Sequence, residues 1–317
     1  MARSLTFGSR PGASRRCANA VPSGVRRVLC LIPLVALACV DGSDNPPPDP
    51  ITIFAAASLA KPLRELTATF QRETRVPALV ELGGSIEQSR KLTDLGRIPD
   101  VLVLVDDEVI AALMPAHLDW YVRFATNQIV IAYTGRSTHA DSISLENWYR
   151  VLMRDDVSVG RADATLAPAG RHALALLQRA EGVYGLPNLS ERILERSALR
   201  YVRPNAAELA VLLETGEVDY ILEYESVARQ YGFNFLALPA ELSIPVLYGV
   251  TVPRHAAHMA AAVRFVSAML SDEGKEILRE AHVSLLRVPV AMGTNVPGEI
   301  TEVVRTLAAG NAAAASP

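Results

Sequence analysis

Two serines and an Ala-Gly pair stand where strands are expected to end and helices to begin. Ser58 closes an apolar run, Ser85 follows a pair of glycines, and Ala169-Gly170 follows a proline. The first N–H groups of a helix have no intrahelical partner and can bind an anion, and hydroxyls add further donors. An ordinary helix cap would explain each position alone. The three together predict a site for a small oxyanion.

These positions belong to an alternation of strand and helix patterns that begins after Pro50. The apolar, β-rich runs that predict strands lie at 51–58, 77–85, 100–107, 127–134, 157–162, 199–204, 218–224, 233–239 and 244–253. Helical patterns separate most of them, and a helical stretch at 258–281 with a break near Ser271 follows. Alternating β and α elements predict an α/β fold with mostly parallel sheets.

The same pattern predicts two lobes that the chain crosses twice. We expect residues 51–130 to form the first part of lobe 1, residues 131–246 to form lobe 2, and residues 247–317 to return to lobe 1. Ligands on open α/β sheets bind outside the carboxyl ends of the strands. The oxyanion site is therefore expected in the cleft between the lobes.

The N-terminal segment is interpreted as a targeting signal followed by a tether. Arginines precede a short apolar run that ends at Cys39, and this pattern predicts a signal peptide at residues 1–38. The end of the run resembles a bacterial lipobox, so we expect Cys39 to be lipidated; ordinary cleavage near Ala38 is the alternative. Residues 39–50 are proline-rich and predict an extended tether. We therefore expect the protein in the periplasm or on the extracellular face, anchored by lipid.

Composition and motifs exclude several classes of function. The 317 residues carry a net charge of -3, which gives no basic face for nucleic acid. All three cysteines precede the proline-rich tether, so the predicted folded body has no disulfide and no thiolate metal site. None of the common nucleotide-binding, serine-hydrolase or zinc-protease motifs occurs. We therefore expect no catalysis and no cofactor.

Several stretches, in order along the chain, resemble a known family. "FAAASLAKPLRELTATF" is similar to the opening of bacterial periplasmic molybdate-binding proteins. "GGSIEQSRKLTDLGRIPDVLVLVDD", "DWYVRFATNQIVIAYT" and "VDYILEYESVARQYGF" resemble the tungstate/molybdate-binding proteins first known from archaea. The resemblance runs from about Ile51 to Pro289. It implies a two-lobed type II periplasmic-binding-protein fold that serves an ABC permease, and we expect a monomer.

The resemblance also implies roles for individual residues. Ser58 and Ser85 match the two ligand-binding serines, and Tyr224 falls where bacterial members place a pocket tyrosine. The stretch that contains Ala169 and Gly170 resembles a bacterial motif whose backbone contributes to a tetrahedral site. Ala206 falls near a backbone donor, a looser match.

Glu223 matches one of two carboxylates that coordinate the metal centre of the anion in the archaeal-type members. Where the other carboxylate would stand, this chain has Ala167. The coordination number of a bound molybdate or tungstate therefore stays open, since a carboxylate beside a dianion is repulsive unless it bonds the metal or is protonated. The alternative for Glu223 is a surface glutamate at a strand end.

The resemblance, together with the predicted oxyanion site, implies an extracytoplasmic solute-binding protein that captures molybdate or tungstate for an ABC importer. One alternative is a protein of the same fold for another anion, such as sulfate, phosphate or an organic carboxylate. A second is a sensor or enzyme domain on this fold. A carboxylate in the cleft at Glu223 would fit poorly with sulfate or phosphate, so its position bears on the first alternative.

Overall fold

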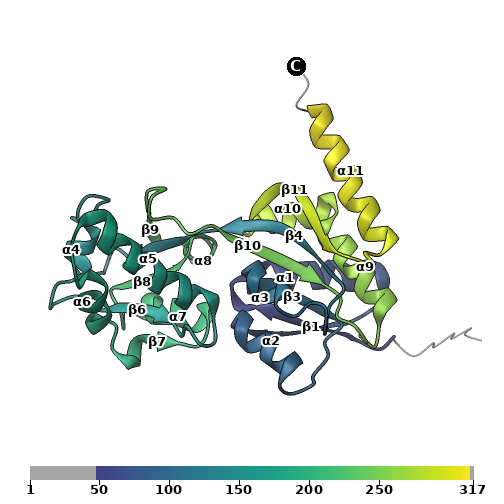
Figure 1. Ribbon diagram of the computed structural model, residues 1–317, viewed down its shortest axis with the longest axis horizontal. Helices are drawn as coiled ribbons and strands as arrows, with labels where there is room; N and C mark the ends of the chain where they lie inside the picture. The colour runs from purple at the N-terminus through teal and green to yellow at the C-terminus, as the bar shows by residue number, and fades with distance from the viewer. Residues whose placement is uncertain (1–47, 315–317) are drawn as a thin grey trace, which may run out of the picture. The chain divides into compact units, whose positions relative to one another are not determined.

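The chain forms two β-sheets with helices around them, as the computed structural model shows for residues 48–314. The predicted signal peptide, Cys39 and most of the predicted tether lie outside the described residues. In Figure 1 each sheet forms the centre of one lobe, and strands β4 and β10 run between the two. The predicted α/β class with two lobes is confirmed.

The larger sheet, within residues 48–314, has six strands in the order β11-β4-β10-β3-β1-β2. Their bounds are β1 (Ile51–Ala56), β2 (Ala78–Gly83), β3 (Val101–Val105), β4 (Trp120–Asn127), β10 (Val246–Thr251) and β11 (Ser284–Gly293). Strand β1 pairs in parallel with β2 and β3, whereas β10 and β11 run antiparallel to their neighbours. The prediction of mostly parallel sheets is therefore wrong, because the strands that come back from the second lobe reverse direction.

Helices lie on both faces of this sheet. They are η1 (Ala57–Leu59), α1 (Ala60–Thr74), α2 (Ser85–Thr93), α3 (Asp107–Ala111), α9 (Met259–Leu270), α10 (Asp272–Glu280) and α11 (Gly298–Ala314). Alternate residues of a strand face opposite sides, and so Leu104 of β3 packs in the core under α2 and α3 while Val103 packs in the core that includes Phe265 of α9. The predicted break near Ser271 is confirmed, since the Ser271 hydroxyl accepts from the Gly274 N–H at 3.2 Å and starts α10.

The smaller sheet, in the same part of the chain, has five strands in the order β7-β6-β8-β5-β9. The strands are β5 (Ile129–Tyr133), β6 (Val159–Ala162), β7 (Val202–Arg203), β8 (Tyr220–Tyr224) and β9 (Asn234–Ala237). The helices are α4 (Trp148–Leu152), α5 (Pro168–Tyr184), α6 (Leu189–Arg196), η2 (Leu199–Tyr201), α7 (Ala206–Thr215) and α8 (Glu225–Gln230). Strand β6 pairs in parallel with β7 and β8.

The first crossing between the lobes falls at Gln128, between β4 and β5. It lies slightly before the predicted boundary at residues 130/131, because Ile129 and Val130 already pair with Tyr224 and Glu223 of the smaller sheet. Asn127 fixes this crossing: its side-chain amide lies 2.7 Å from the hydroxyl of Ser226 and 2.6 Å from that of Tyr248.

The parallel pairs decide where the functional residues lie. Ala56 and Gly83 are register partners at the ends of β1 and β2, so η1 and α2 begin beside each other. In the smaller sheet α5 follows β6 and α7 follows β7, which are parallel neighbours. Each lobe therefore presents two helix starts at the carboxyl ends of adjacent strands. Among residues 48–314, no helix has the length and apolar character needed to cross a bilayer.

Candidate functional site

A cavity of about 20 Å³ lies where the strand ends of the two lobes meet. Lobe 1 lines it with Ala56, Ala57, Ser58, Gly83, Gly84, Ser85 and Val105, and lobe 2 with Ala167, Pro168, Ala169, Asn205, Ala206 and Tyr224. The starts of η1, α2, α5 and α7 all contribute to this lining. None of these lining residues has a charged side chain, so the cavity is polar through backbone N–H groups and neutral side chains.

Ser85 is held in place by the neighbouring strand. Its side chain is almost fully buried, and its hydroxyl oxygen accepts a hydrogen bond from the Val105 N–H at 2.9 Å. That bond uses a lone pair and leaves the hydroxyl proton available. Ser85 can therefore donate to a ligand from a fixed position.

Ser58 has a hydroxyl that is buried without a partner among the described residues. A buried polar atom without a hydrogen bond costs free energy, and a ligand that accepts from Ser58 would remove this cost. The main chain here is tied to the other lobe, because Gln230 donates from its side-chain amide to the Ser58 carbonyl at 3.1 Å.

The start of α5 brings only one of its two predicted donors to the cavity. Ala169 lines it, whereas Gly170 does not, because the Gly170 N–H already donates to the Ala167 carbonyl at 3.1 Å. A Cβ at Gly170 would lie 2.4 Å from the Ala162 carbonyl oxygen. Glycine is needed here for close packing of α5 against the end of β6, and the predicted donor role of Gly170 is corrected.

The start of α7 adds lining residues that the sequence reasoning largely missed. Ala206 was matched only loosely and Asn205 was not predicted. The Asn205 side chain caps α7 by accepting from the Glu208 N–H at 3.1 Å. The signal was present in the sequence, since an asparagine directly before an apolar helical pattern is a typical N-cap.

Tyr224 lines the cavity and connects it to an ion pair between the lobes. Its hydroxyl lies 3.1 Å from Nδ1 of His172, whose Nε2 lies 3.4 Å from Asp106. Asp106 of lobe 1 also pairs with Arg171 of lobe 2 at 2.8 Å. Burial and the nearby Glu223 carboxyl hold the pKa of Tyr224 well above its ordinary value, so its phenol stays protonated.

Asp106 stays ionised despite its burial. Burial alone would raise the pKa of Asp106, but the hydrogen bond with His172 and the charge of Arg171 outweigh burial and lower it. The backbone of Asp106 has a φ of 74°, which is unusual for a residue other than glycine. It is held there by the Asp106 N–H, which donates to the Leu247 carbonyl at 2.9 Å, and by the ion pair.

Glu223 is fully buried, which excludes the surface glutamate considered as its alternative, but it does not line the cavity. One carboxyl oxygen accepts from the Tyr224 N–H at 2.8 Å, and the other has no partner among the described residues. Burial raises the pKa of Glu223 to about 7, although the bond from Tyr224 opposes the shift. Glu223 thus lies one residue from the cavity wall with one oxygen unsatisfied.

The two lobes touch directly beside the cavity. The Glu87 N–H of α2 donates to the Leu166 carbonyl of lobe 2 at 3.0 Å. A Cβ at Gly84 would lie 2.2 Å from that carbonyl oxygen and 3.1 Å from the carbonyl oxygen of Pro204. Only glycine allows the backbones to approach this closely.

The donor set of the cavity suits an anion rather than a metal cation. Within residues 48–314, no group of three or more His, Cys, Asp and Glu side chains is arranged to hold a metal ion. Helix starts, two serine hydroxyls and a phenol provide N–H and O–H donors from several directions. An oxyanion with several acceptor oxygens matches such a set.

Comparison with known proteins gives one family and one fold. The sequence profile of bacterial extracellular solute-binding proteins matches residues 51–283. A molybdate/tungstate-binding protein, WtpA, of Pyrococcus abyssi is 31% identical, in an alignment that covers 89% of this chain and 98% of that protein.

Solved structures share the fold at lower identity. The periplasmic molybdate-binding protein of Azotobacter vinelandii matches with a TM-score of 0.60 at 16% identity, over 74% of this chain and 99% of the other. The sulfate-binding protein SubI of Mycobacterium tuberculosis matches with a TM-score of 0.61 at 16% identity, over 82% and 92%. At this identity the likeness concerns the fold alone.

Proposed function

The chain belongs to the family of bacterial extracellular solute-binding proteins, and from this membership we propose that it captures molybdate or tungstate and delivers it to an ABC permease. The identity with a molybdate/tungstate-binding relative over most of both chains supports this choice of anion. The family acts outside the cytoplasm, and its members bind solutes rather than convert them. We extend both properties to this protein.

The observation that carries the proposal is the cavity whose lining has no charged side chain and four helix starts. A dianion held by neutral dipoles needs no counter-charge if enough N–H and O–H groups point at it. Ser58, Ser85 and the N–H of Ala169 are the proposed donors. Ala206 and the hydroxyl of Tyr224 complete the set from lobe 2.

Capture requires the lobes to move. A cavity of about 20 Å³ is near the volume that one water needs, so an anion with four oxygens enters only when the lobes separate. The contacts that must break beside the cavity are few, chiefly the Glu87 hydrogen bond, the Gln230 hydrogen bond and the Asp106–Arg171 ion pair. We propose that the lobes separate, admit the anion and close on it, and that the permease recognises the closed form.

For the bound anion we propose tetrahedral coordination. Direct bonding to the metal centre needs carboxylates in the cavity wall, and the lining residues include none. Ala167 stands where one carboxylate would be, and Glu223 is buried but is not among the lining residues. Because burial raises the pKa of Glu223 to about 7, a proton on this carboxyl near neutral pH would remove the charge that would otherwise repel an anion in the adjacent cavity.

The attachment of the protein is also a proposal. A signal peptide at residues 1–38 and a lipid on Cys39 would place the folded body at the membrane surface on a proline-rich tether. We propose that it works there as a monomer, since the cavity is complete within one chain.

Calorimetric titration with molybdate, tungstate, sulfate and phosphate tests the function. Tight binding of molybdate and tungstate with weak or absent binding of the other two is the expected result. Glu223→Ala separates the coordination modes: loss of metal-oxyanion binding would favour direct coordination, and a small effect would favour the tetrahedral mode. Tight binding of sulfate or phosphate alone would replace the proposed ligand, and no heat with any of the four would overturn the assignment.

A further inference from the structure

A second, larger pocket adjoins the cavity on its outer side. It has a volume of about 250 Å³ and shares Ala57, Ser58 and Ala206 with the lining of the cavity. Its remaining residues are Ala60, Lys61, Arg64, Ala207, Val227, Gln230 and Tyr231. We call it the outer pocket. Both lobes form it, since α1 provides one side and the end of α8 the other.

The outer pocket has two cationic side chains without a counter-charge. Lys61 and Arg64 are exposed on the first turns of α1, and in the described part of the chain neither forms an ion pair with a carboxylate. Burial and the Glu214 carboxylate raise the pKa of Tyr231, while Arg64 lowers it. Glu65 follows Arg64 on α1 but does not line the pocket. Glu214 does not line the pocket. The only charged side chains in the lining of this pocket are therefore cations.

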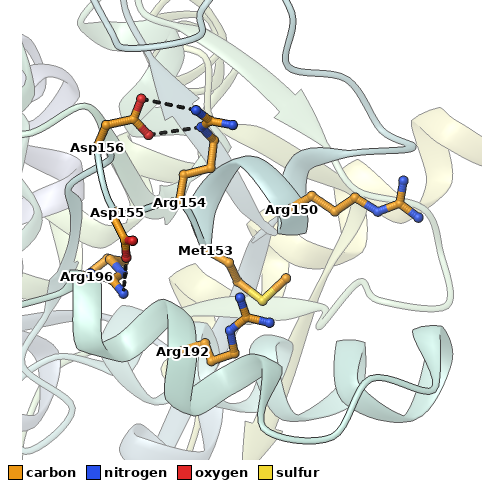
Figure 2. Close-up of a pocket in the computed structure, with 7 residues that line it drawn as sticks. All are labelled: Arg150, Met153, Arg154, Asp155, Asp156, Arg192 and Arg196. Atoms are coloured by element: carbon orange, nitrogen blue, oxygen red, sulfur yellow. Dashed lines mark hydrogen bonds and ion pairs between the residues drawn. The ribbon is translucent and has the colours of Figure 1, made fainter.

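Elsewhere on the protein some basic side chains beside a pocket are paired with carboxylates. Figure 2 shows such a place on lobe 2, a pocket of about 650 Å³ in which Arg154 pairs with Asp156 and Arg196 with Asp155. Arg150 and Arg192 line the same pocket without a carboxylate partner in the part of the chain that the structure describes. This pocket shares no lining residue with the cavity.

We propose that the outer pocket is a second anion site, in which Lys61 and Arg64 capture the dianion before it reaches Ser58. The proposal rests on the proposed function, because it names the entry route to the same cavity. The protein as a whole is anionic, with a net charge of -3, so a dianion has no general attraction to it. A concave patch of positive charge raises the local concentration of the anion and its association rate.

The two sites differ in the distance over which they attract the anion. Unpaired charges act over several ångströms and are screened by salt. The neutral donors of the cavity act only at hydrogen-bond distance. Capture by Lys61 and Arg64 should therefore depend strongly on ionic strength, whereas retention by Ser58 and Ser85 should depend on it much less.

The test is the association rate constant for molybdate, measured by stopped flow, of the Lys61→Gln/Arg64→Gln double variant at two ionic strengths. At about 20 mM salt we expect this rate constant to fall about tenfold, and at about 500 mM salt the difference should nearly vanish. Arg150→Gln/Arg192→Gln is the matched control, because it removes the same charge from exposed arginines of a pocket that does not adjoin the cavity. The control should bind as the unmodified protein does at both salt concentrations.

Each other outcome counts against a specific statement. If the unmodified protein binds molybdate and the association rate constants of the two double variants fall equally, only the total charge matters and the outer site is overturned. A loss that persists at high salt would show that Lys61 and Arg64 support the fold or the cavity instead, which also overturns it. If the unmodified protein binds neither molybdate nor tungstate, the proposed function fails and the outer site fails with it.

Discussion

Both lobes line the cavity with two helix starts, but lobe 1 adds the hydroxyls of Ser58 and Ser85, whereas the one hydroxyl of lobe 2 belongs to Tyr224. The Ser58 hydroxyl has no partner among the described residues and can turn toward a ligand, whereas Ser85 is fixed by the hydrogen bond from the Val105 N–H. The backbone donors of lobe 2 are fixed by the helices that carry them. The Tyr224 hydroxyl is also committed in part, because it lies 3.1 Å from His172.

This difference indicates an order of events. In the proposed mechanism, an anion is bound first by the serine hydroxyls of lobe 1 while the lobes are apart, and closure then adds the donors of lobe 2. Lobe 2 also contains Ala167, which replaces the second carboxylate of the archaeal-type members, and the buried Glu223. We therefore propose that lobe 1 binds the anion first and that lobe 2 determines its coordination.

The largest effect on anion affinity should come from a substitution that leaves the lining of both lobes unchanged but prevents the lobes from closing. In Gly84→Ala the new Cβ would lie 2.2 Å from the Leu166 carbonyl oxygen, and such overpacking costs about 3 kcal/mol, or about a hundredfold in affinity. Thermal stability of the free protein should hardly change, since the lobes can separate to relieve the contact. Gly182→Ala is the control, because nothing lies within 4 Å of its Cβ. Unchanged affinity in Gly84→Ala would show that closure does not need this contact.

Glu223 allows a test of lobe 2 through stability and pH. In the folded protein its pKa is raised to about 7 from an ordinary value of 4.5, so between these values the folded state binds more protons than the unfolded chain. Stability should therefore fall as pH rises through this window, by about 2 kcal/mol between roughly pH 5.5 and 8. Urea unfolding of the ligand-free protein at the two pH values measures the fall.

In Glu223→Gln this contribution to the pH dependence should disappear. Glu191→Gln, an exposed change on α6, should leave the dependence as it is. If the free energy of unfolding depended on pH equally in the unmodified protein and in Glu223→Gln, the Glu223 carboxyl would be solvated. The buried carboxyl would then no longer distinguish lobe 2 from lobe 1.

The smallest of the three effects should come from single donors of lobe 1. Ser58→Ala or Ser85→Ala should each weaken molybdate binding about tenfold, since a hydrogen bond to a charged group contributes about 1.5 kcal/mol or more. Tyr224→Phe on the opposite wall should cost less, because its hydroxyl is shared with His172. Calorimetry gives all three values.

Ser89→Ala serves as the control for these changes. Its hydroxyl lies on the same helix as Ser85 and donates to the Ile86 carbonyl at 2.8 Å, and it does not line the cavity. A larger loss of molybdate affinity in Tyr224→Phe than in either serine variant would contradict the proposal that lobe 1 binds the anion first.

The strand ends and helix starts that form the site could be predicted from the sequence. An apolar run that ends in serine predicts a strand followed by a helix start; the structure has Ser58 in η1 and Ser85 at the start of α2, each two residues beyond the end of its strand. Two-lobed topology also followed from the alternation of elements. These features depend on neighbours within a few residues, and so a single sequence reveals them.

Features that depend on distant partners were missed or misjudged. Strand β11 was not predicted, and Pro289 within it argues against a central strand; the structure places β11 at an edge, where a missing N–H is tolerated. Gly170 looked like a donor because its helix start resembles the others. Its N–H is occupied and its missing side chain makes room for β6, which only packing reveals.

The position of β4 has a consequence for how the chain reaches this structure. Both neighbours of β4 in the larger sheet, β10 and β11, come from residues 246–293. During synthesis and export, β4 emerges long before either partner exists, and the whole of lobe 2 must follow it first. Pairing over such sequence separation is slow and leaves apolar strands such as β4 uncovered meanwhile. Lobe 1 is therefore the first part of the described chain to be made and the last to be finished.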